Sequence, residues 1–474
     1  MKKLLLPLLC ALCALALPAR AQQTVTIPRP DPAIAEFARG VKFTVAGYTG
    51  TEVQADFPVL VRLSTAISGF SYSDFYADGS DLSLVDIGFV DAEGNGLAYE
   101  IDTWNPSGES LVWVSLPRMT NGTEFAMWYR SSKTGKALNS DNVWADYTGV
   151  WHLNESGSAG TPVLDSSTNI LNGTAQGLSA SVASGKIGGS WRISDYYASD
   201  RKDAGIVIDL TDATRNAKVN ALGDTFTASF WVQKKDKETK WCVTGINRRP
   251  DGSTAGWGTQ IHDGTKQLRI YANGGKNIYV YNNNGMTGLD TANQWGKMDV
   301  VWFNNNGTIG YQLYWNGSPI SVDKAQNNPP TTPVSQPSGV NLVIGNVQST
   351  TSDRAWSGEM DEVRLRKGVP TAARVKADYD TVNNATFLTA GSVVEVAVVE
   401  RPVANLQVVD TGASHVQFGN AISSLGSSDA TECAFNVKVW KTAEGEPAGY
   451  TALSTGLTVG ARSGVVKGLT PETA

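Results

Sequence analysis

The region between Gly149 and Asp380 is divided into short segments, each long enough for one β-strand. The segments are rich in Trp, Val, Ile and Phe, and turn-forming pairs such as Asn316-Gly317 separate them. Strand-length apolar segments between regular turn signals are typical of antiparallel sheets that pack face to face. The chain's 48 glycines suit the same architecture, because many tight turns favour a residue without a side chain. This region is therefore expected to fold as a β-sandwich.

Two flanking regions show the same pattern of strand-length segments separated by turn residues. The whole chain is therefore predicted to be all-β, built of tandem β-sandwiches. Residues 40–131 contain strand-length segments separated by turns such as Asn95-Gly96. Residues 401–474 contain further strand-like segments. Residues 22–39 carry several prolines and are expected to be a linker, and residues 393–400 are expected to be an extended connector.

The N-terminus has the pattern of a secretory signal peptide over residues 1–21. Two lysines precede an apolar stretch, Leu4–Leu17, and Ala19-Arg20-Ala21 fits a small-residue cleavage site. The apolar stretch is short for a bilayer span, and no later segment is long and apolar enough for a transmembrane helix. The protein is therefore expected to be exported, secreted or held at the cell surface, with the periplasm as an alternative.

The net charge of the chain narrows the classes of binding partner. Removal of the basic residues Lys2, Lys3 and Arg20 changes the formal net charge from −6 to −9. An acidic mature chain argues against nucleic acid or an anionic membrane as partner.

Two cysteines remain after the signal, Cys242 and Cys433, and their wide separation favours two isolated thiols, with a disulfide left open.

The central region carries a family resemblance. Its last strand-length segment reads Gly-Glu-Met-Asp-Glu-Val-Arg at 358–364, and residues 369–382 carry Pro370 near their start and continue with helix formers. This order resembles the laminin-G-like, concanavalin A-like lectin/glucanase family. The resemblance implies a concanavalin A-like jelly roll over residues 149–388 with a short capping helix. That family mostly binds ligands outside cells, and only some relatives catalyse reactions.

The flanking regions carry resemblances of their own. The Pro-Val-Leu-Val, Tyr-Glu-Ile-Asp-x-Trp and Trp-Val-Ser-Leu-Pro segments of residues 40–131 resemble a bacterial domain of unknown function that often precedes laminin-G-like modules. The Gly-Leu-x-Pro-x-Thr sequence near the C-terminus resembles a turn of fibronectin type III-like modules. The sequence stops at Ala474, where that module's next strand is expected, so either this is a fragment of a longer protein or its end is unusual.

A row of acidic residues at Glu359, Asp361 and Glu362 raises the question of glycoside hydrolysis. Glycosidases with this type of sandwich carry Glu-x-Asp-x-Glu or Glu-x-Asp-x-x-Glu on one strand, because a retaining mechanism needs two carboxylates about 5 Å apart. Here the third position is Val363 or, if the strand contains a bulge, Arg364. The pattern is incomplete, so no catalytic residue is predicted, and Asp361 or Glu362 is expected to pair with an arginine or a backbone amide.

The chain's three histidines, His152, His262 and His415, lie in separate segments without metal-ligand spacing or a nucleophile elbow. His152 is expected to be a satisfied histidine in the core or at the rim. Calcium is the plausible metal, with Asp165, Asn169 and Asp361 as candidate ligands, since laminin-G-like relatives often hold this ion at the sandwich rim. The alternative for Asp165 is an Asx-type turn.

Residues 241–284 form the predicted ligand-binding region, because aromatic residues are interspersed there with Asn, Asp and Gly. Aromatic rings stack on sugars, and amide or carboxylate groups bind their hydroxyls. The alternative is that the aromatic residues are core and the Asn-Gly pairs are hairpin turns. The candidate ligand-binding residues are Trp257, His262, Asp263, Tyr271, Asn273, Tyr279 and Tyr281.

The sequence thus predicts a bacterial extracellular binding or adhesion protein. Its partner is expected to be carbohydrate or a cell-surface polymer, with an extracellular protein as an alternative. Two other interpretations remain open. One is a polysaccharide-degrading glycoside hydrolase or its accessory part, which requires a carboxylate pair in a cleft. The other is a structural surface scaffold, in which modules contact each other only at edges and ends.

Overall fold

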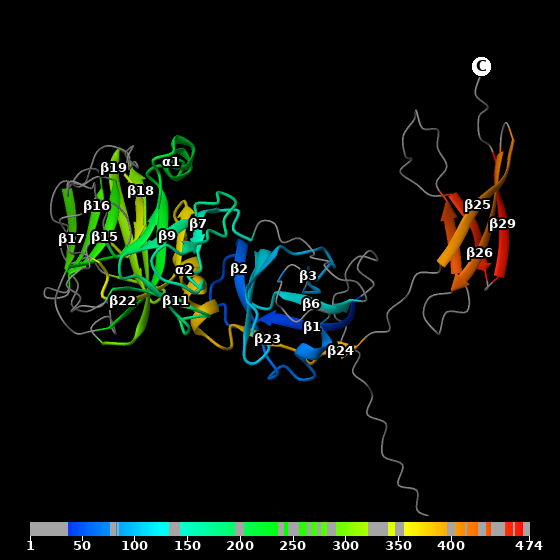
Figure 1. Cartoon of the computed structure of the whole chain (residues 1–474), viewed down its shortest axis with the longest axis horizontal. Coiled ribbons are helices and arrows are strands. Elements are labelled where there is room, and N and C mark those ends of the chain that lie inside the picture. The colour runs from blue at the N-terminus through cyan, green and yellow to red at the C-terminus, as the bar shows by residue number, and fades with distance from the viewer. Residues whose placement is uncertain are drawn as a thin grey trace, which may run out of the picture.

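The computed structural model confirms the all-β prediction (Figure 1). Two α-helices occur in the described part of the chain, α1 (Ala213–Asn220) and α2 (Ala372–Asn383). None of the described helices has the length and hydropathy needed to cross a bilayer. The structure describes residues 37–75, 82, 85–131, 143–194, 203–235, 241–244, 256–262, 267–272, 276–281, 291–320, 340–346, 355–395, 403–412, 415–424, 433–437, 451–457 and 460–467.

The first module is a sandwich of two small sheets. One sheet contains β1 (Phe37–Val45), β6 (Glu124–Ser131) and β3 (Ile87–Asp91). The other has the order β2-β5-β4, formed by β2 (Gln54–Leu63), β5 (Ser110–Met119) and β4 (Tyr99–Thr103). Alternate apolar residues of both sheets meet in one core, which includes Val41, Phe57, Phe89, Val112 and Met127.

Two strands from far along the chain complete the first module. β23 (Leu388–Ala390) and β24 (Val394–Glu395) both pair with β1, with Phe43 opposite Ala390 and Arg39 opposite Glu395. The predicted connector at 393–400 therefore begins as a strand of the first sheet. The physical reason is the free edge of β1, whose backbone groups gain partners from this returning segment. In the sequence, the second module is therefore inserted between β6 and β23 of the first.

The second module is a larger sandwich (Figure 1). Its main sheet has the order β10-β11-β22-β13-β18-β19-β20, and β7 also pairs with β22. Two four-stranded sheets, β21-β12-β9-β8 and β14-β15-β16-β17, contribute to the same sandwich. The strands are β7 (Tyr147–Trp151), β8 (Pro162–Val163), β9 (Gly173–Gln176), β10 (Ala180–Val182), β11 (Ser190–Ser194), β12 (Gly205–Ile208), β13 (Phe226–Lys234), β14 (Trp241–Thr244), β15 (Trp257–His262), β16 (Gln267–Ala272), β17 (Lys276–Tyr281), β18 (Trp295–Asn305), β19 (Thr308–Trp315), β20 (Ser318–Pro319), β21 (Leu342–Ile344) and β22 (Gly358–Lys367).

Strand β18 shows how the main sheet is covered on both faces. Met298, Val300 and Trp302 belong to the sandwich core. Val301, on the opposite face, packs with Val375 of α2. The helix expected over 369–382 is thus confirmed, and its N-cap Thr371 accepts a hydrogen bond from the backbone of Arg374.

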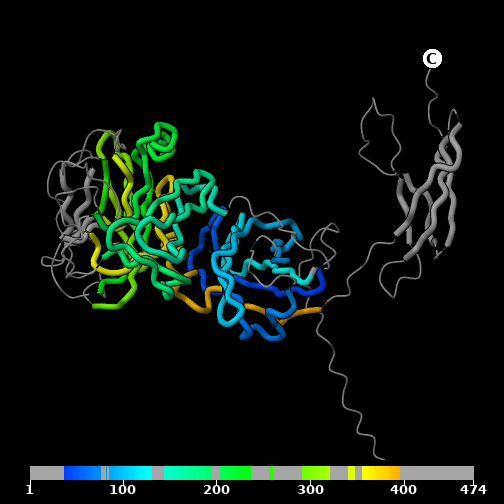
Figure 2. The backbone as a smooth tube through the Cα atoms, viewed as in Figure 1, coloured from blue at the N-terminus to red at the C-terminus, as the bar shows by residue number. Residues whose placement is uncertain are grey.

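The two modules meet in a shared interface that includes α2 (Figure 2). Leu60 and Trp113 of the first module pack in one buried cluster with Val150 and Trp231 of the second. A hydrogen bond also crosses the interface, since the backbone amide of Leu60 donates to the side-chain Oγ1 of Thr381 at 2.9 Å. The modules therefore contact each other through a buried apolar surface rather than through a linker.

The C-terminal region also folds as strands. β25 (Val403–Gly412), β26 (His415–Ser424) and β29 (Gly460–Lys467) form one sheet, while β27 (Cys433–Val437) pairs with β28 (Thr451–Leu457). This agrees with the all-β prediction for residues 401–474. The resemblance to fibronectin type III-like modules, and the resemblance proposed for residues 40–131, both stay predictions.

Candidate functional site

The predicted ligand-binding region coincides with the sheet β14-β15-β16-β17. Its antiparallel register aligns residues in rows across the strands. In one row His262 pairs with Trp241 and Gln267, and Gln267 pairs with Tyr281. In the next row Arg269 pairs with Gln260 and Tyr279, and in a third row Tyr271 pairs with Gly258 and Asn277.

The two faces of this sheet are distinguished by β15. Trp257 is 3% exposed and Thr259 is 2% exposed, so these residues mark the core face. Residues alternate between faces along a strand, and directly paired residues share a face. Four of the predicted residues therefore share the face opposite the core, in company with several polar neighbours. The residues placed on that outer face are Trp241, Val243, Gly258, Gln260, His262, Gln267, Arg269, Tyr271, Asn277, Tyr279 and Tyr281.

Trp257 is not on that face, and its predicted ligand-binding role is corrected. Its ring packs against Phe226 and Trp302, with centroid separations of 4.7 and 5.2 Å. The indole is a core side chain, and Thr259, two residues on along β15, is buried on the same face. The predicted residues Asp263 and Asn273 lie outside the described residues.

The candidate calcium ligand Asp165 forms a turn. Its carboxylate accepts hydrogen bonds from the backbone amides of Val150, Ser167 and Leu171 at 2.8, 2.9 and 2.7 Å. Asn169 donates its side-chain amide to the Thr148 carbonyl at 3.0 Å. The structure therefore shows the turn that was the alternative for Asp165, and the carboxylate organises the loop after β7.

Strand β22 contains a bulge at the acidic residues. Ser229 pairs with Arg364 and Trp231 with Asp361, so one residue of β13 opposes two of β22. Glu362, one of those two, has a positive φ of 50°, which is uncommon for a residue with a side chain. The bulge leaves Met360 and Val363 in the sandwich core and sets Asp361 and Glu362 together on the other face. With the bulge, the third position of the glycosidase pattern is Arg364.

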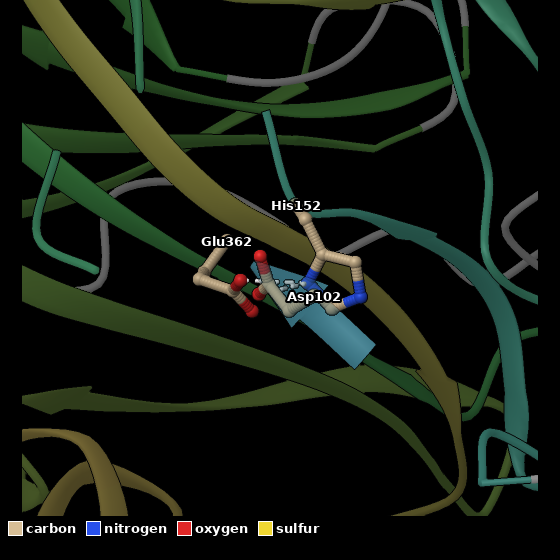
Figure 3. Close-up of side chains that lie close together, drawn as sticks. All are labelled: Asp102, His152 and Glu362. Carbon is tan, nitrogen blue, oxygen red and sulfur yellow. Dashed lines mark hydrogen bonds and ion pairs between the residues drawn. The ribbon is translucent and has the colours of Figure 1, made fainter. Parts of the chain in front are cut away.

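A cluster of ionisable side chains lies at the joint between the modules (Figure 3). Asp102 comes from β4 of the first module, His152 directly follows β7, and Glu362 comes from β22. His152 Nδ1 lies 2.7 Å from Glu362 Oε1 and 3.5 Å from Asp102 Oδ2. Its other nitrogen, Nε2, lies 3.4 Å from Glu100 Oε2. The side chains of His152, Asp102 and Glu362 are 6%, 2% and 1% exposed, so this joint is an ionic cluster shielded from solvent.

The pKa values of the cluster are strongly perturbed. Burial alone would lower the pKa of His152, but Glu362, Asp102 and Glu100 outweigh it and raise that pKa well above its usual value. For Asp361, burial raises the pKa of the carboxyl group well above its usual value, and the neighbouring Glu362 raises it further. Both shifts favour the protonated forms, the imidazolium for His152 and the neutral acid for Asp361.

Arg364 fixes the cluster from the side of the second module. Its guanidinium donates to Glu362 Oε2, with Nε at 3.0 Å, and lies between the rings of Trp113 and Trp144, 4.3 and 4.6 Å from their centroids. It also pairs with Asp378 of α2 at 3.2 Å. Both the charge and the planar shape of arginine are used here.

His152 is a satisfied histidine, as predicted, but its partners Glu362, Asp102 and Glu100 were not predicted. A usable signal was present in the Tyr-Glu-Ile-Asp segment. Glu100 and Asp102 occupy alternate positions of one strand there and therefore share a face. Two acids on one face of a strand in a tandem sandwich indicate a polar or cationic neighbour. What the sequence alone could not identify is the module that supplies it.

Comparison with known proteins gives several structural likenesses. No curated protein matches the chain. Domain 4 of AbnA, a GH43 extracellular arabinanase from Geobacillus stearothermophilus solved with arabinotriose, is 17% identical, with 49% of this chain and 98% of that chain covered and a TM-score of 0.34. The botulinum neurotoxin type G receptor binding domain is 13% identical, with 50% and 51% covered and a TM-score of 0.31. Trypanosoma rangeli sialidase is 11% identical, with 64% and 44% covered and a TM-score of 0.33.

A family model supplies the more specific result. The matched segment lies wholly within the second module and includes the sheet β14-β15-β16-β17, the bulged strand β22 and the start of α2. Residues 208–376 thus match the concanavalin A-like lectin/glucanases superfamily, in agreement with the sandwich fold of this module.

Proposed function

We propose that this chain is an exported bacterial carbohydrate-binding protein that binds a glycan on the outer face of β14-β15-β16-β17. The single observation that carries the proposal is the register of that sheet. It gathers Trp241, His262, Tyr271, Tyr279 and Tyr281 on one face. Aromatic rings offer flat apolar surfaces for the faces of sugar rings.

The polar residues of the same face support the proposal. Polar residues pair directly with aromatic ones in each row: Gln267 with Tyr281, Arg269 with Tyr279, and Asn277 with Tyr271. Amide and guanidinium groups supply donors, and the amides also supply acceptors, for the hydroxyl groups of a sugar. A face that combines stacking and hydrogen-bonding residues suits a glycan better than it suits a purely apolar ligand.

The environment of β22 supports binding rather than hydrolysis by this strand. Asp361 is fully buried beneath the joint with the first module, and Arg364 occupies the place of a third carboxylate. A retaining glycosidase needs two carboxylates that both reach the scissile bond. Export rests on the signal-like residues 1–21, which lie outside the described residues.

The proposal is tested by retention of the full chain on a panel of immobilised polysaccharides. We expect retention by at least one glycan, and we expect Gln267→Ala to weaken it about tenfold, the loss of about 1.4 kcal/mol. Gln312→Ala is the matched control, since Gln312 is an exposed glutamine on β19 of the main sheet. Absence of retention on every glycan, or an equal loss in both variants, would contradict the proposal.

A further inference from the structure

We propose that Asp102, His152 and Glu362 bind a divalent transition-metal ion at the joint between the two modules. Each side chain offers one ligand atom, and these atoms all lie within 4.8 Å of one another (Figure 3). The donors are one imidazole nitrogen and two carboxylate oxygens. Zinc binds both histidine nitrogens and carboxylate oxygens, and a site with three protein ligands leaves a fourth position open.

The groups around the three ligands hold them as the outer contacts of metal ligands usually do. His152 turns Nε2 toward the carboxylate of Glu100, which leaves Nδ1 directed at Asp102 and Glu362. Histidines that bind metals commonly donate their second nitrogen to a carboxylate in this way. The second carboxylate oxygen of Glu362, Oε2, accepts a hydrogen bond from Arg364 Nε at 3.0 Å.

Asp102 is held in the same manner. Its Oδ1 accepts from Asn154 Nδ2 at 2.7 Å and from Thr103 Oγ1 at 3.0 Å. Its Oδ2 accepts from Trp113 Nε1 at 3.2 Å and faces His152. The carboxylate is therefore oriented by its neighbours, with the oxygen nearest His152 directed into the cluster.

The joint brings several carboxyl groups close to one imidazole. Glu100, Asp102 and Glu362 each place an oxygen within 3.5 Å of a ring nitrogen of His152, and Arg364 donates to Glu362. Farther out, Asp378 and Asp299 are paired with Lys297. Asp361 lies outside the ligand set, since its Oδ2 accepts hydrogen bonds from the backbone amides of Lys186 and Ile187 at 2.7 and 3.1 Å. Buried carboxylates are stable when they are paired or coordinate a metal.

The donor set selects the kind of ion. Calcium takes six to eight oxygen ligands, so a site with an imidazole donor does not suit it. Zinc, cobalt and manganese accept mixed imidazole and carboxylate ligands. The separation of 2.7 Å between His152 Nδ1 and Glu362 Oε1 is that of a hydrogen bond. The ion would therefore replace the proton on Nδ1 and widen this separation, and that proton is its competitor.

The ion would join the modules, because Asp102 belongs to the first module and the other two ligands to the second. A site assembled from both modules exists only when they are docked, so binding would stabilise the docked state. Since all three ligands are buried, uptake is expected while the modules dock, and exchange from the folded protein is expected to be slow.

The experiment is refolding of the full chain from denaturant with chelator, then with cobalt, zinc or manganese. Metal analysis is expected to give one ion per chain, and cobalt is expected to give the visible absorption of a four- or five-coordinate ion. The thermal midpoint is expected to rise with the bound ion. His152→Gln and Glu362→Gln are expected to lose both the ion and the absorption.

Asp299→Asn is the matched control, since this buried carboxylate pairs with Lys297 outside the ligand set. It is expected to lower the thermal midpoint and still bind one ion. If the wild-type chain refolds fully and retains none of the three ions, the proposal is overturned and the joint is an imidazolium–carboxylate cluster. The same conclusion follows if His152→Gln binds cobalt as the wild-type chain does.

Discussion

At the scale of single residues, Asp378 shows how buried charges hold α2 to the main sheet. Burial opposes ionisation of this carboxyl group, but Lys297 and Arg364 overcome it and lower its pKa to about 2. Lys297 Nζ lies 2.7 Å from Asp378 Oδ2. Lys297 belongs to β18 and Arg364 to β22, and both strands lie beneath the helix. A carboxyl group whose pKa is lowered by folding stabilises the folded state when it is ionised.

Replacement of Asp378 is therefore expected to have a pH-dependent effect. The carboxyl group of Asp378 stabilises the fold fully above its pKa in the unfolded chain, near 3.8, and this stabilisation is lost as the pH falls toward its folded-state pKa of about 2. We expect Asp378→Asn to reduce the free energy of unfolding by about 2 kcal/mol or more at pH 7, since Lys297 and Arg364 also lose a partner. Urea unfolding at pH 7, 4 and 2.5 measures the difference, which should shrink with acidity. A constant difference would contradict this account.

A second residue-level prediction concerns Trp257, whose ring packs in the core with Phe226 and Trp302. We expect Trp257→Ala to reduce the free energy of unfolding by about 3–5 kcal/mol, because it removes a large buried side chain and leaves a cavity. Urea unfolding followed by circular dichroism measures it. A variant with unchanged stability and lost glycan retention would instead return Trp257 to the ligand-binding face.

At the scale of elements, the bulge in β22 determines which side chains reach the joint. It places Asp361 and Glu362 on the face that meets the first module, while Val363 remains in the core. Glu362 adopts its positive φ at a cost of about 1–2 kcal/mol, which its bonds to His152 and Arg364 offset.

Two glutamates of β22 should therefore respond very differently to truncation. In chelator-treated buffer we expect Glu362→Ala to reduce the free energy of unfolding by about 3–5 kcal/mol, since it removes the nearest carboxylate partner of both buried His152 and buried Arg364. Glu359→Ala is the comparison, and its partner Arg192 lies 3.7 Å away and 39% exposed, so we expect a loss below about 1 kcal/mol. Equal losses in chemical denaturation would contradict the role assigned to the bulge.

The elements also show what the sequence could predict. Strand segments, turns and the helix after β22 were predictable, because alternation and turn residues act over a few positions. The inward position of Trp257 was partly predictable, since Thr259 and Ile261 share its parity on β15. The bulge at Glu362 was not, because one inserted residue changes the face of its neighbours without a local signal. The partners of His152 depend on a contact between modules, which periodicity within one segment does not encode.

At the scale of the whole molecule, the two modules are built as one unit. β23 and β24 return from the second module to pair with β1, and Leu60 and Trp113 are buried at the joint. The notion of independent modules joined by a connector therefore does not describe residues 37–395.

Coupling between the modules should appear in their unfolding. We expect Leu60→Ala to reduce the free energy of unfolding by about 2–5 kcal/mol in both modules, because Leu60 packs between them. Hydrogen exchange of the amides of β6 and β18 compares the two modules directly. Faster exchange confined to β6 would show that the modules unfold independently.

The measurement that tests the central claim most directly is calorimetric titration of the full chain with an oligosaccharide derived from a polysaccharide that retains the protein. The account predicts binding by the wild-type chain and by Gln312→Ala, with affinity reduced about tenfold or more in a Tyr279→Ala/Tyr281→Ala variant that keeps its thermal midpoint. Undiminished affinity in that variant would contradict the placement of the site on the outer face of β14-β15-β16-β17.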